Sequence, residues 1–256
     1  PSAYGVRIST FHGFCNSVIR DNPEKFLLSP KESVAIDDVK QIQIIRQIID
    51  SLPNTSSFKN INSPYFYQKD IIRSIQNLKR ENITPDKFKE LIKCAQDFVK
   101  IATPVVDSLS AIRASKKATT EITNIIQSLL SQNLNILYQT RIKYFLDLFS
   151  QNEITLSVLK QQTKDFITKT QNSLDKQTDL LIVYKEYQQQ LIKQNLFDFE
   201  DMILWVVTVF RNDKNILADY QEKFQYILVD EFQDTNSAQM EVINLLIQSQ
   251  ENPNIF

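Results

Sequence analysis

The stretch that decides the fold is Tyr226–Asn236, which runs YILVDEFQDTN. Its first four residues form a short continuous apolar run of the kind that buried parallel strands show. The run ends in Asp230 and Glu231, and we expect a helix over residues 237–248 before a second strand at Asn254–Phe256. A strand, an acidic pair, a helix and another strand together indicate an α/β arrangement.

The acidic pair stands where ligands bind in open α/β sheets, beyond the carboxyl ends of the strands. An aspartate there, Asp230, can hold Mg²⁺ through its waters while the metal bridges the β- and γ-phosphates of a nucleotide. The neighbouring Glu231 can orient and deprotonate an attacking water. A strand that ends in two acids by chance is also common, so the pair alone leaves both interpretations open.

Outside this stretch the sequence predicts a mainly helical chain. The alternation over Val6–Thr10 predicts a short strand, which runs into a helix that ends near Arg20. From about residue 31 to residue 194 the apolar residues recur at helical spacing almost without interruption. The later helices of this block are expected over residues 104–115, 118–133, 135–149, 155–170 and 174–194.

Composition and charge exclude several classes of protein. The formal net charge is −1, so no global field draws the chain to nucleic acid or to a membrane, and any basic footprint must be local. Cys15 and Cys94 form no CxxC pair, so neither a zinc site nor a disulfide framework is predicted. The longest apolar run, Met202–Phe210, is too short to span a bilayer. No signal peptide is visible, and we expect a cytoplasmic protein.

Basic residues gather near the middle of the helical block, at Lys79–Arg80, Lys87, Lys89 and Lys93. Acidic residues are interleaved among them. This pattern is typical of solvated helix faces, and contact of some of these residues with duplex DNA or the DNA backbone stays open as the alternative.

The residues that follow the acidic pair match a known motif at more positions than chance would produce. Val229–Asn236 resembles, almost residue for residue, the Walker B motif of the UvrD/Rep helicases of superfamily 1. Thr10–Phe14 resembles the family's TFHxF motif, and Leu196–Ile203 resembles the motif in which an aromatic packs on a base. Ile75–Pro85, in its IQNLK and ITP strings, resembles the inserted helical subdomain. The four motifs stand in the family's order.

For DNA binding, the resemblance implies that Thr10 and His12 contact the backbone of single-stranded DNA, which a hydroxyl and an imidazole N–H can both do. It also implies that Phe199 stacks on a base, a contact that tolerates any sequence. Each residue has a plainer alternative. A lone histidine is more often a satisfied core or surface residue, and an aromatic at the start of a helix can simply belong to the core.

For catalysis, the resemblance implies that Asp230 and Glu231 are the catalytic carboxylates, with Asp230 also holding Mg²⁺ through water. Gln233 and Asp234 would support them. The implied cofactors are Mg²⁺ and ATP. The implied activity is ATP-driven movement 3′ to 5′ on single-stranded DNA and unwinding at junctions of single and double strands, as in DNA repair.

The fold implied by the resemblance is mainly α with a few parallel strands. Residues 1–30 and 196–256 would belong to a partial RecA-like core of the P-loop NTPase type, and residues 31–195 to a large helical insertion. Within that insertion the segment of about 94–178 matches nothing in the family. We expect it to form ordered helices and treat it as a candidate site for a protein partner.

The sequence also departs from the family. No GxxxxGK[ST] loop, the Walker A motif, is present, and the only glycines are Gly5 and Gly13. The glutamine motif for adenine and the second RecA-like domain with its arginine finger are absent too. We therefore interpret the chain as a fragment of a helicase and expect it to be inactive as an ATPase on its own.

Two alternatives stay open. One is the helicase half of a RecB/AddA-like helicase–nuclease, which shares the acidic motif and a similar His-Gly-Phe-Cys string. The other is a non-enzymatic DNA-binding helical scaffold that kept a degenerate ATPase half. The intact Asp230 and Glu231 argue against the scaffold.

Overall fold

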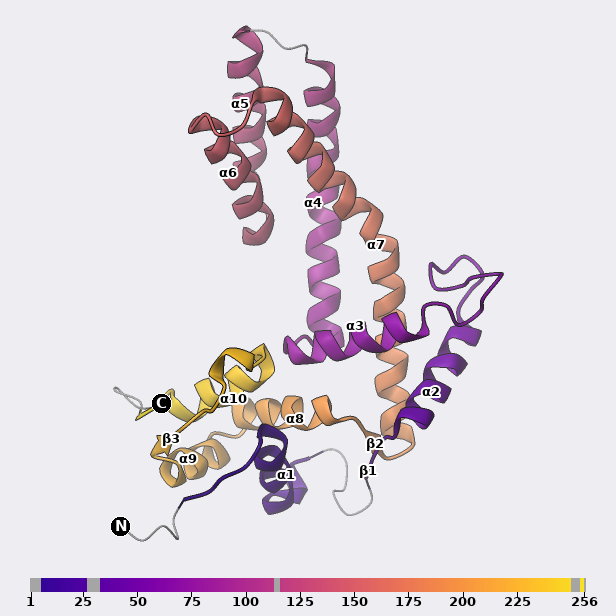
Figure 1. Ribbon diagram of the computed structural model, residues 1–256, viewed down its shortest axis with the longest axis vertical. Helices are drawn as coiled ribbons and strands as arrows, with labels where there is room; N and C mark the ends of the chain where they lie inside the picture. Colours follow the sequence, from indigo (N-terminus) through magenta and orange to yellow (C-terminus); the bar gives the residue numbers. More distant parts are fainter. Residues whose placement is uncertain (1–5, 27–32, 113–115, 250–253, 256) are drawn as a thin grey trace. The chain divides into compact units, whose positions relative to one another are not determined.

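The structure is a computed structural model that describes residues 6–26, 33–112, 116–249 and 254–255. It divides into two compact units, Pro1–Pro85 with Ile182–Phe256, and Asp86–Leu181. Most of the described residues are helical and the few strands are parallel, as predicted (Figure 1). None of the described helices combines the length and the apolar character that crossing a membrane requires.

The core of the first unit is built around α8 (Phe199–Asn212), which is buried on most of its surface. It contacts α1 (Phe11–Asp21) and α10 (Ser237–Ile247) along its length, and α9 (Lys214–Lys223) packs beside it (Figure 1). The side chains at the centre of this cluster are fully buried and come from α1 and α8: Cys15, Val18, Val206 and Phe210.

The described strands are short and form two parallel pairs. β1 (Val34–Ala35) pairs with β2 (Leu196–Phe197), and β3 (Tyr226–Ile227) pairs with β4 (Asn254–Ile255). Phe256, the last residue of the second predicted strand, lies outside the described residues.

Two strand predictions differ from the structure. Val6–Thr10 forms no strand, because no strand in the described part of the chain lies beside it to accept its hydrogen bonds. β3 ends at Ile227, two residues earlier than expected, and Leu228 is 77% exposed. A buried parallel strand needs cover on both faces. Ile227 packs partly against the core of this unit, but the next residue, Leu228, does not.

The same unit holds α2 (Asp38–Ser51) and α3 (Gln68–Arg80). Asp37 caps α2 by accepting the N–H of Lys40 at 2.7 Å, which satisfies one of the free donors of the first turn. Pro53 follows the end of α2, as expected of a residue that cannot continue a helix. On α3 the buried residues Ile71 and Ile75 recur at a spacing of four, and this spacing places residue 79 on the same buried face.

The second unit has an apolar core of its own, made by α4 (Pro85–Ala111), α5 (Lys116–Leu130), α6 (Ile136–Ser150) and α7 (Leu156–Lys193). Phe98 stacks on Tyr138 there, with ring centroids 4.3 Å apart. The prediction of ordered helices for this segment is thus confirmed for its described residues.

Two helix boundaries in this region were predicted wrongly. The expected break before Pro104 does not occur, because Ala102 and Leu109 on either side of it are buried in one core, and tertiary packing outweighs the proline's preference. The expected helices 155–170 and 174–194 are one helix of 38 residues, α7. The sequence between them, Gln171–Ser173, contains no glycine or proline to stop a helix.

Three helices are followed by an asparagine with left-handed backbone: Asn82 after α3, Asn152 after α6 and Asn195 after α7, with φ of 54°, 62° and 51°. Glycine usually fills this position because it has no Cβ, and asparagine is the best substitute. A chain with two glycines thus ends its helices without them.

A buried charge cluster ties α3 to the first turn of α8. The Lys79 side chain is fully buried, and its Nζ lies 2.5 Å from Asp198 Oδ2 and 2.7 Å from Asp201 Oδ1. Tyr187 of α7 donates from its hydroxyl to Asp198 at 3.3 Å, and Gln41 of α2 donates to that hydroxyl at 2.8 Å. One cluster therefore joins four helices of the first unit.

We expect Lys79→Met to lower the free energy of unfolding by about 3–5 kcal/mol, because it leaves two buried carboxylates without a counter-ion. Urea denaturation followed by the emission of Trp205, the only tryptophan, measures this directly in α8. Arg211→Met is the control, since its ion pair with Glu241 is half exposed and should contribute less than about 1 kcal/mol. Equal effects of the two substitutions would contradict a structural role for the buried cluster.

Candidate functional site

Thr10 lies at the start of α1 and caps it. Its backbone is extended, and its Oγ1 accepts the N–H of Gly13 at 3.1 Å. A Cβ at position 13 would come within 3.3 Å of that oxygen, so the glycine keeps the cap uncrowded. The Thr10 side chain is exposed, and a hydroxyl that accepts one hydrogen bond can still donate its proton to another group.

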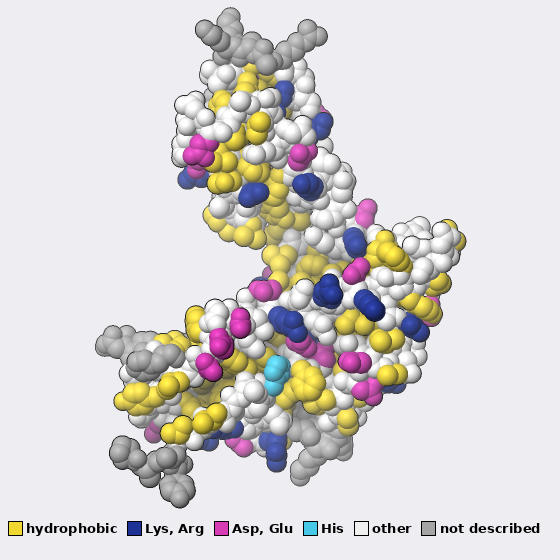
Figure 2. Space-filling model, viewed as in Figure 1, with side chains coloured by type: hydrophobic (Ala, Val, Ile, Leu, Met, Phe, Trp, Pro, Cys, Tyr) yellow, Lys and Arg dark blue, Asp and Glu magenta, His cyan; other side chains and the backbone are white. Residues whose placement is uncertain are grey.

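The predicted DNA residues lie close together. The His12 ring meets the ring of Phe199 edge to face, with centroids 5.8 Å apart. Phe199 is 58% exposed, which rules out the alternative that it is a core aromatic. Figure 2 shows the chain's only histidine at the surface, beside apolar side chains and between basic and acidic ones. Thr10, His12 and Phe199 therefore offer two polar groups and an open aromatic face on one small area.

The acidic segment follows β3 and is exposed throughout. Asp230 Oδ1 accepts the N–H of Glu231 at 3.0 Å, and the side-chain amide of Gln233 donates to Glu231 Oε2. Phe232–Asp234 forms a short 3₁₀ turn. The hydrogen bond from the Glu231 N–H uses only Oδ1 of Asp230 and does not involve Oδ2. A single carboxylate with waters and substrate phosphates is the usual way in which proteins bind Mg²⁺, so the residues fit the implied ion.

Glu231 has left-handed backbone, with φ of 49° and ψ of 46°. A non-glycine residue other than asparagine or aspartate rarely adopts this conformation, which costs on the order of 1 kcal/mol or more. Such strain is concentrated at functional sites in proteins. It turns the chain sharply between Asp230 and the 3₁₀ segment.

The end of the motif has a structural role. Asn236 caps α10 by accepting the N–H of Gln239 at 3.0 Å, and the Gln239 side chain accepts the N–H of Asn236 at 3.0 Å. This reciprocal capping box satisfies two free donors at the start of α10. Asn236, the last residue of the motif, and Gln239 behind it therefore fix where α10 begins.

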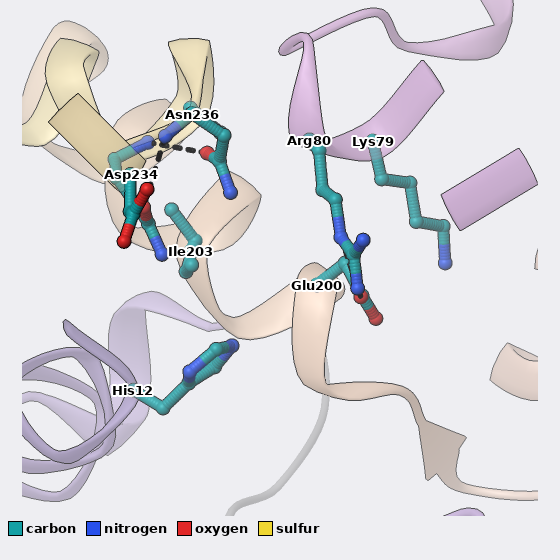
Figure 3. A pocket seen from close by; sticks show the side chains of 9 residues that line it. His12, Lys79, Arg80, Glu200, Ile203, Asp234 and Asn236 are labelled. Carbon is teal, nitrogen blue, oxygen red and sulfur yellow. Dashed lines mark hydrogen bonds and ion pairs between the residues drawn. The ribbon is translucent and has the colours of Figure 1, made fainter. Parts of the chain in front are cut away.

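A cavity of about 300 Å³ is lined by His12, one of the predicted DNA residues, and by Asp234 of the acidic segment (Figure 3). His12 Nε2 is buried and lacks a hydrogen-bond partner among the described residues, so a polar group that entered could satisfy it. The side chains around the cavity come from α1, α3, α8, the 3₁₀ turn Phe232–Asp234 and the start of α10, and include His12, Arg80, Glu200, Asp234, Asn236 and Gln239.

The comparison with known protein families decides the assignment. The whole chain, residues 1–256, matches the model of the UvrD/REP helicase N-terminal domain. The chain belongs to the UvrD/REP helicase family. The resemblance inferred from the four motifs is therefore confirmed.

Three relatives illustrate the match. The chain is 37% identical over 91 residues to the ATP-dependent DNA helicase PcrA of Leuconostoc citreum, covering 36% of this chain and 12% of that protein. It is 35% identical over 126 residues to the ATP-dependent DNA helicase Rep of Buchnera aphidicola, covering 49% and 17%. It is 48% identical over 64 residues to PcrA of Staphylococcus epidermidis, covering 25% and 9%. The matched segment is thus a small part of each relative.

In this UvrD/REP helicase domain Lys79 is the residue that sequence reasoning misplaced. We predicted a solvated helix face for Lys79 and Arg80, yet the Lys79 side chain is 0% exposed, while that of Arg80 is 51% exposed. Two signals pointed to burial. Lys79 continues the four-residue spacing of Ile71 and Ile75, and Asp198 and Asp201 open a helix that is otherwise apolar on most faces, so they need a buried partner.

The two carboxyls of this cluster differ in their proton affinity. Burial raises the pKa of both, but at Asp198 the charge and hydrogen bond of Lys79 outweigh burial and hold the pKa below its usual value. At Asp201 burial dominates, and the negative charge of Asp198 adds to it, so the pKa rises to about 6. One ammonium neutralises one of the two carboxylates, and the other binds a proton more strongly.

This difference predicts a pH dependence of stability. Between about pH 4 and pH 6, Asp201 binds a proton more strongly in the folded chain than in the unfolded chain. Its contribution to the free energy of unfolding is therefore present at low pH and lost as the pH rises through this window. Relative to Asp201→Asn, the unsubstituted chain should become less stable from pH 4 to pH 7 in urea denaturation.

Asp213→Asn supplies a control of opposite sign. Lys25 and backbone N–H groups lower the pKa of Asp213, so this carboxylate favours the folded chain above its unfolded pKa, and that advantage is lost as the pH falls. If both substitutions change the pH profile in the same direction, the assignment of the raised pKa to Asp201 is wrong.

Proposed function

We propose that this chain is part of an ATP-driven superfamily 1 translocase that moves 3′ to 5′ on single-stranded DNA and unwinds duplex at junctions, as in DNA repair. The observation that carries the proposal is the exposed Phe199 ring against His12, which lines one cavity together with Asp234 of the acidic segment. The division into a RecA-like core, residues 1–30 and 196–256, and a helical subdomain, residues 31–195, belongs to the same proposal.

On the DNA side, an exposed aromatic ring can stack on any base, and its edge contact with His12 limits how the ring turns. The Thr10 hydroxyl and the His12 imidazole can donate hydrogen bonds to phosphate oxygens, which set register without reading sequence. With a net charge of −1, the chain should bind through a few local contacts and not through a broad basic surface.

On the ATP side, Asp230 would hold Mg²⁺ through water, and Glu231 would orient and deprotonate the attacking water. The Gln233 amide beside Glu231 and the turn that ends at Asp234 support that carboxylate from the protein side. Bound Mg²⁺ would neutralise charge on the phosphates. The phosphate-binding loop and the arginine finger would come from outside this chain.

The segment of about 94–178 is proposed to serve a protein partner and to stay outside ATP hydrolysis. Its helices have their own apolar core, and the residues proposed for catalysis and DNA contact lie in the other unit. We also propose a cytoplasmic location, because the relatives that this chain resembles are DNA helicases.

Phe199→Ala should weaken binding of the chain to a fluorescein-labelled oligo(dT) by about 1–3 kcal/mol, because one stacked base is lost. Fluorescence anisotropy titrations between 50 and 200 mM salt measure the affinity. The slope of log K against log salt should stay at roughly −1.5 to −2, since two or three phosphate contacts remain. Phe66→Ala is the matched control. Phe66 is similarly exposed, at 62%, but it lies just before the N-terminal end of α3, where no DNA residue is proposed. Unchanged affinity in Phe199→Ala would refute the stacking role.

In the whole protein, Glu231→Gln should reduce DNA-stimulated phosphate release at least about a hundredfold, the usual scale for the loss of a general base. Binding of a fluorescent ATP analogue should change little, because glutamine keeps the size and shape of glutamate. Glu222→Gln makes the same substitution on the exposed side of α9 and should leave turnover unchanged. Normal turnover in Glu231→Gln would show that another group activates the water.

A further inference from the structure

The C-terminal end of α3 contacts the start of α8, the helix that carries Phe199. Lys79 binds Asp198 and Asp201 of the first turn of α8. The next residue, Arg80, pairs with Glu200 of the same turn, with 3.1 Å between Nη2 and Oε1. Residues of α3 therefore form ion pairs with Asp198, Glu200 and Asp201, and the one remaining residue of this turn is Phe199.

The contacts of Lys79 are tied to the way in which α8 begins. Asp198 Oδ1 accepts the N–H of Asp201 at 3.0 Å, and Asp201 Oδ2 accepts the N–H of Asp198 at 3.1 Å. This capping box uses one oxygen of each carboxylate. Lys79 Nζ takes the other oxygen of each, Asp198 Oδ2 and Asp201 Oδ1. A single ammonium thus fixes both members of the box at once.

The cluster also receives two hydrogen bonds from side chains of α7. Tyr187 donates to Asp198 Oδ2 at 3.3 Å, and Gln188 donates to Asp201 Oδ1 at 3.1 Å. The ammonium also lies 5.2 Å from the centroid of the Tyr187 ring. Each carboxylate of the capping box is thus bound by Lys79 and by one side chain of α7, which leaves the first turn of α8 little freedom to move.

We propose that Lys79, with Arg80 beside it, is a positioning residue that holds the Phe199 ring against His12 so that the ring can receive a base. This inference rests on the proposed role of Phe199 in stacking. The Lys79 side chain is fully buried and paired with two carboxylates of the protein, so its action on the base is indirect. Its effect passes through the capping box to the backbone of residue 199.

The physical need for such a residue follows from where Phe199 lies. It is the first residue of α8, and the first turn of a helix frays unless its free N–H groups are satisfied. An exposed ring on a fraying turn would have to be ordered each time a base binds, which weakens binding. A buried ion cluster often adds little stability over apolar packing of the same volume, and the role we infer for this one is to fix the geometry of the first turn of α8.

The test compares stacking with binding in the chain of residues 1–256. The probe is an oligo(dT) that carries a single 2-aminopurine, whose fluorescence is quenched when the base stacks, while anisotropy reports binding. The variant is Lys79→Met with Asp198→Asn and Asp201→Asn. It removes the buried charges together, and the asparagines keep the acceptor oxygens of the capping box.

The expected result is that this variant loses most of the 2-aminopurine quenching, as Phe199→Ala does, while the salt slope of binding is unchanged. The control is Lys25→Met with Asp213→Asn. It removes another lysine–aspartate pair, 2.8 Å apart, in which the aspartate also caps a helix, α9, but no proposed DNA residue lies there. The control should quench like the unsubstituted chain.

A measurement without DNA separates this inference from the proposed function. Amide hydrogen exchange of the peptide covering residues 198–203 should become on the order of tenfold faster in the triple variant and little faster in Phe199→Ala. Arg80→Met, a half-exposed site that should fold normally, is expected to speed exchange in the same peptide. It keeps the test decisive if the triple variant does not fold.

Each outcome bears on one claim. If Phe199→Ala itself leaves the quenching intact, the stacking role is wrong, and the exchange rates still decide whether Lys79 holds the turn. If Phe199→Ala loses the quenching while the folded triple variant keeps both quenching and slow exchange, Lys79 is not a positioning residue. Unchanged exchange in Arg80→Met, with a triple variant that fails to fold, would also overturn the proposal.

Discussion

The ammonium group of Lys79 between two buried carboxylates determines how the first unit is assembled. Lys79 and Asp198 are 119 residues apart in the chain, so the contact forms only when the helices around α8 are in place. Burying three ionisable groups is unfavourable unless every one of them is paired. The polar contacts from Tyr187, Gln188 and the capping box meet that condition. The start of α8, and with it the exposed Phe199, follows from this arrangement.

Much of the helical architecture could be predicted, because local signals agree with the fold there. The caps at Asp37 and Thr10 and the stop at Pro53 act within a few residues. The continuity of α4 across Pro104 could not be predicted in this way. It depends on burial in a core formed by residues far away in sequence, and tertiary packing overrides a weak local preference. The continuity of α7 past residue 173 is different, because the local sequence contains no glycine or proline that would stop the helix.

The strands also show that local sequence patterns alone do not determine the structure. The alternation over Val6–Thr10 has the period of a strand, yet a strand exists only where another strand accepts its hydrogen bonds, and the described residues offer none. For the candidate site, the motif match indicated that Thr10, His12 and Phe199 belong together, and the structure brings them together. Lys79 was missed because its own sequence neighbourhood looks polar, and only its spacing from Ile71 and Ile75 shows the buried face.

The left-handed backbone at Glu231 has a consequence for how this position can vary. Glycine would relax the backbone there, and asparagine, which the chain already uses after α3, α6 and α7, would tolerate the conformation too. Neither has a carboxylate, and an amide is no general base. Under the general-base role that we propose for Glu231, selection for a more stable protein and selection for turnover would favour different residues at position 231. A homologue that has given up catalysis would be free to replace its glutamate by one of the residues that fit the turn.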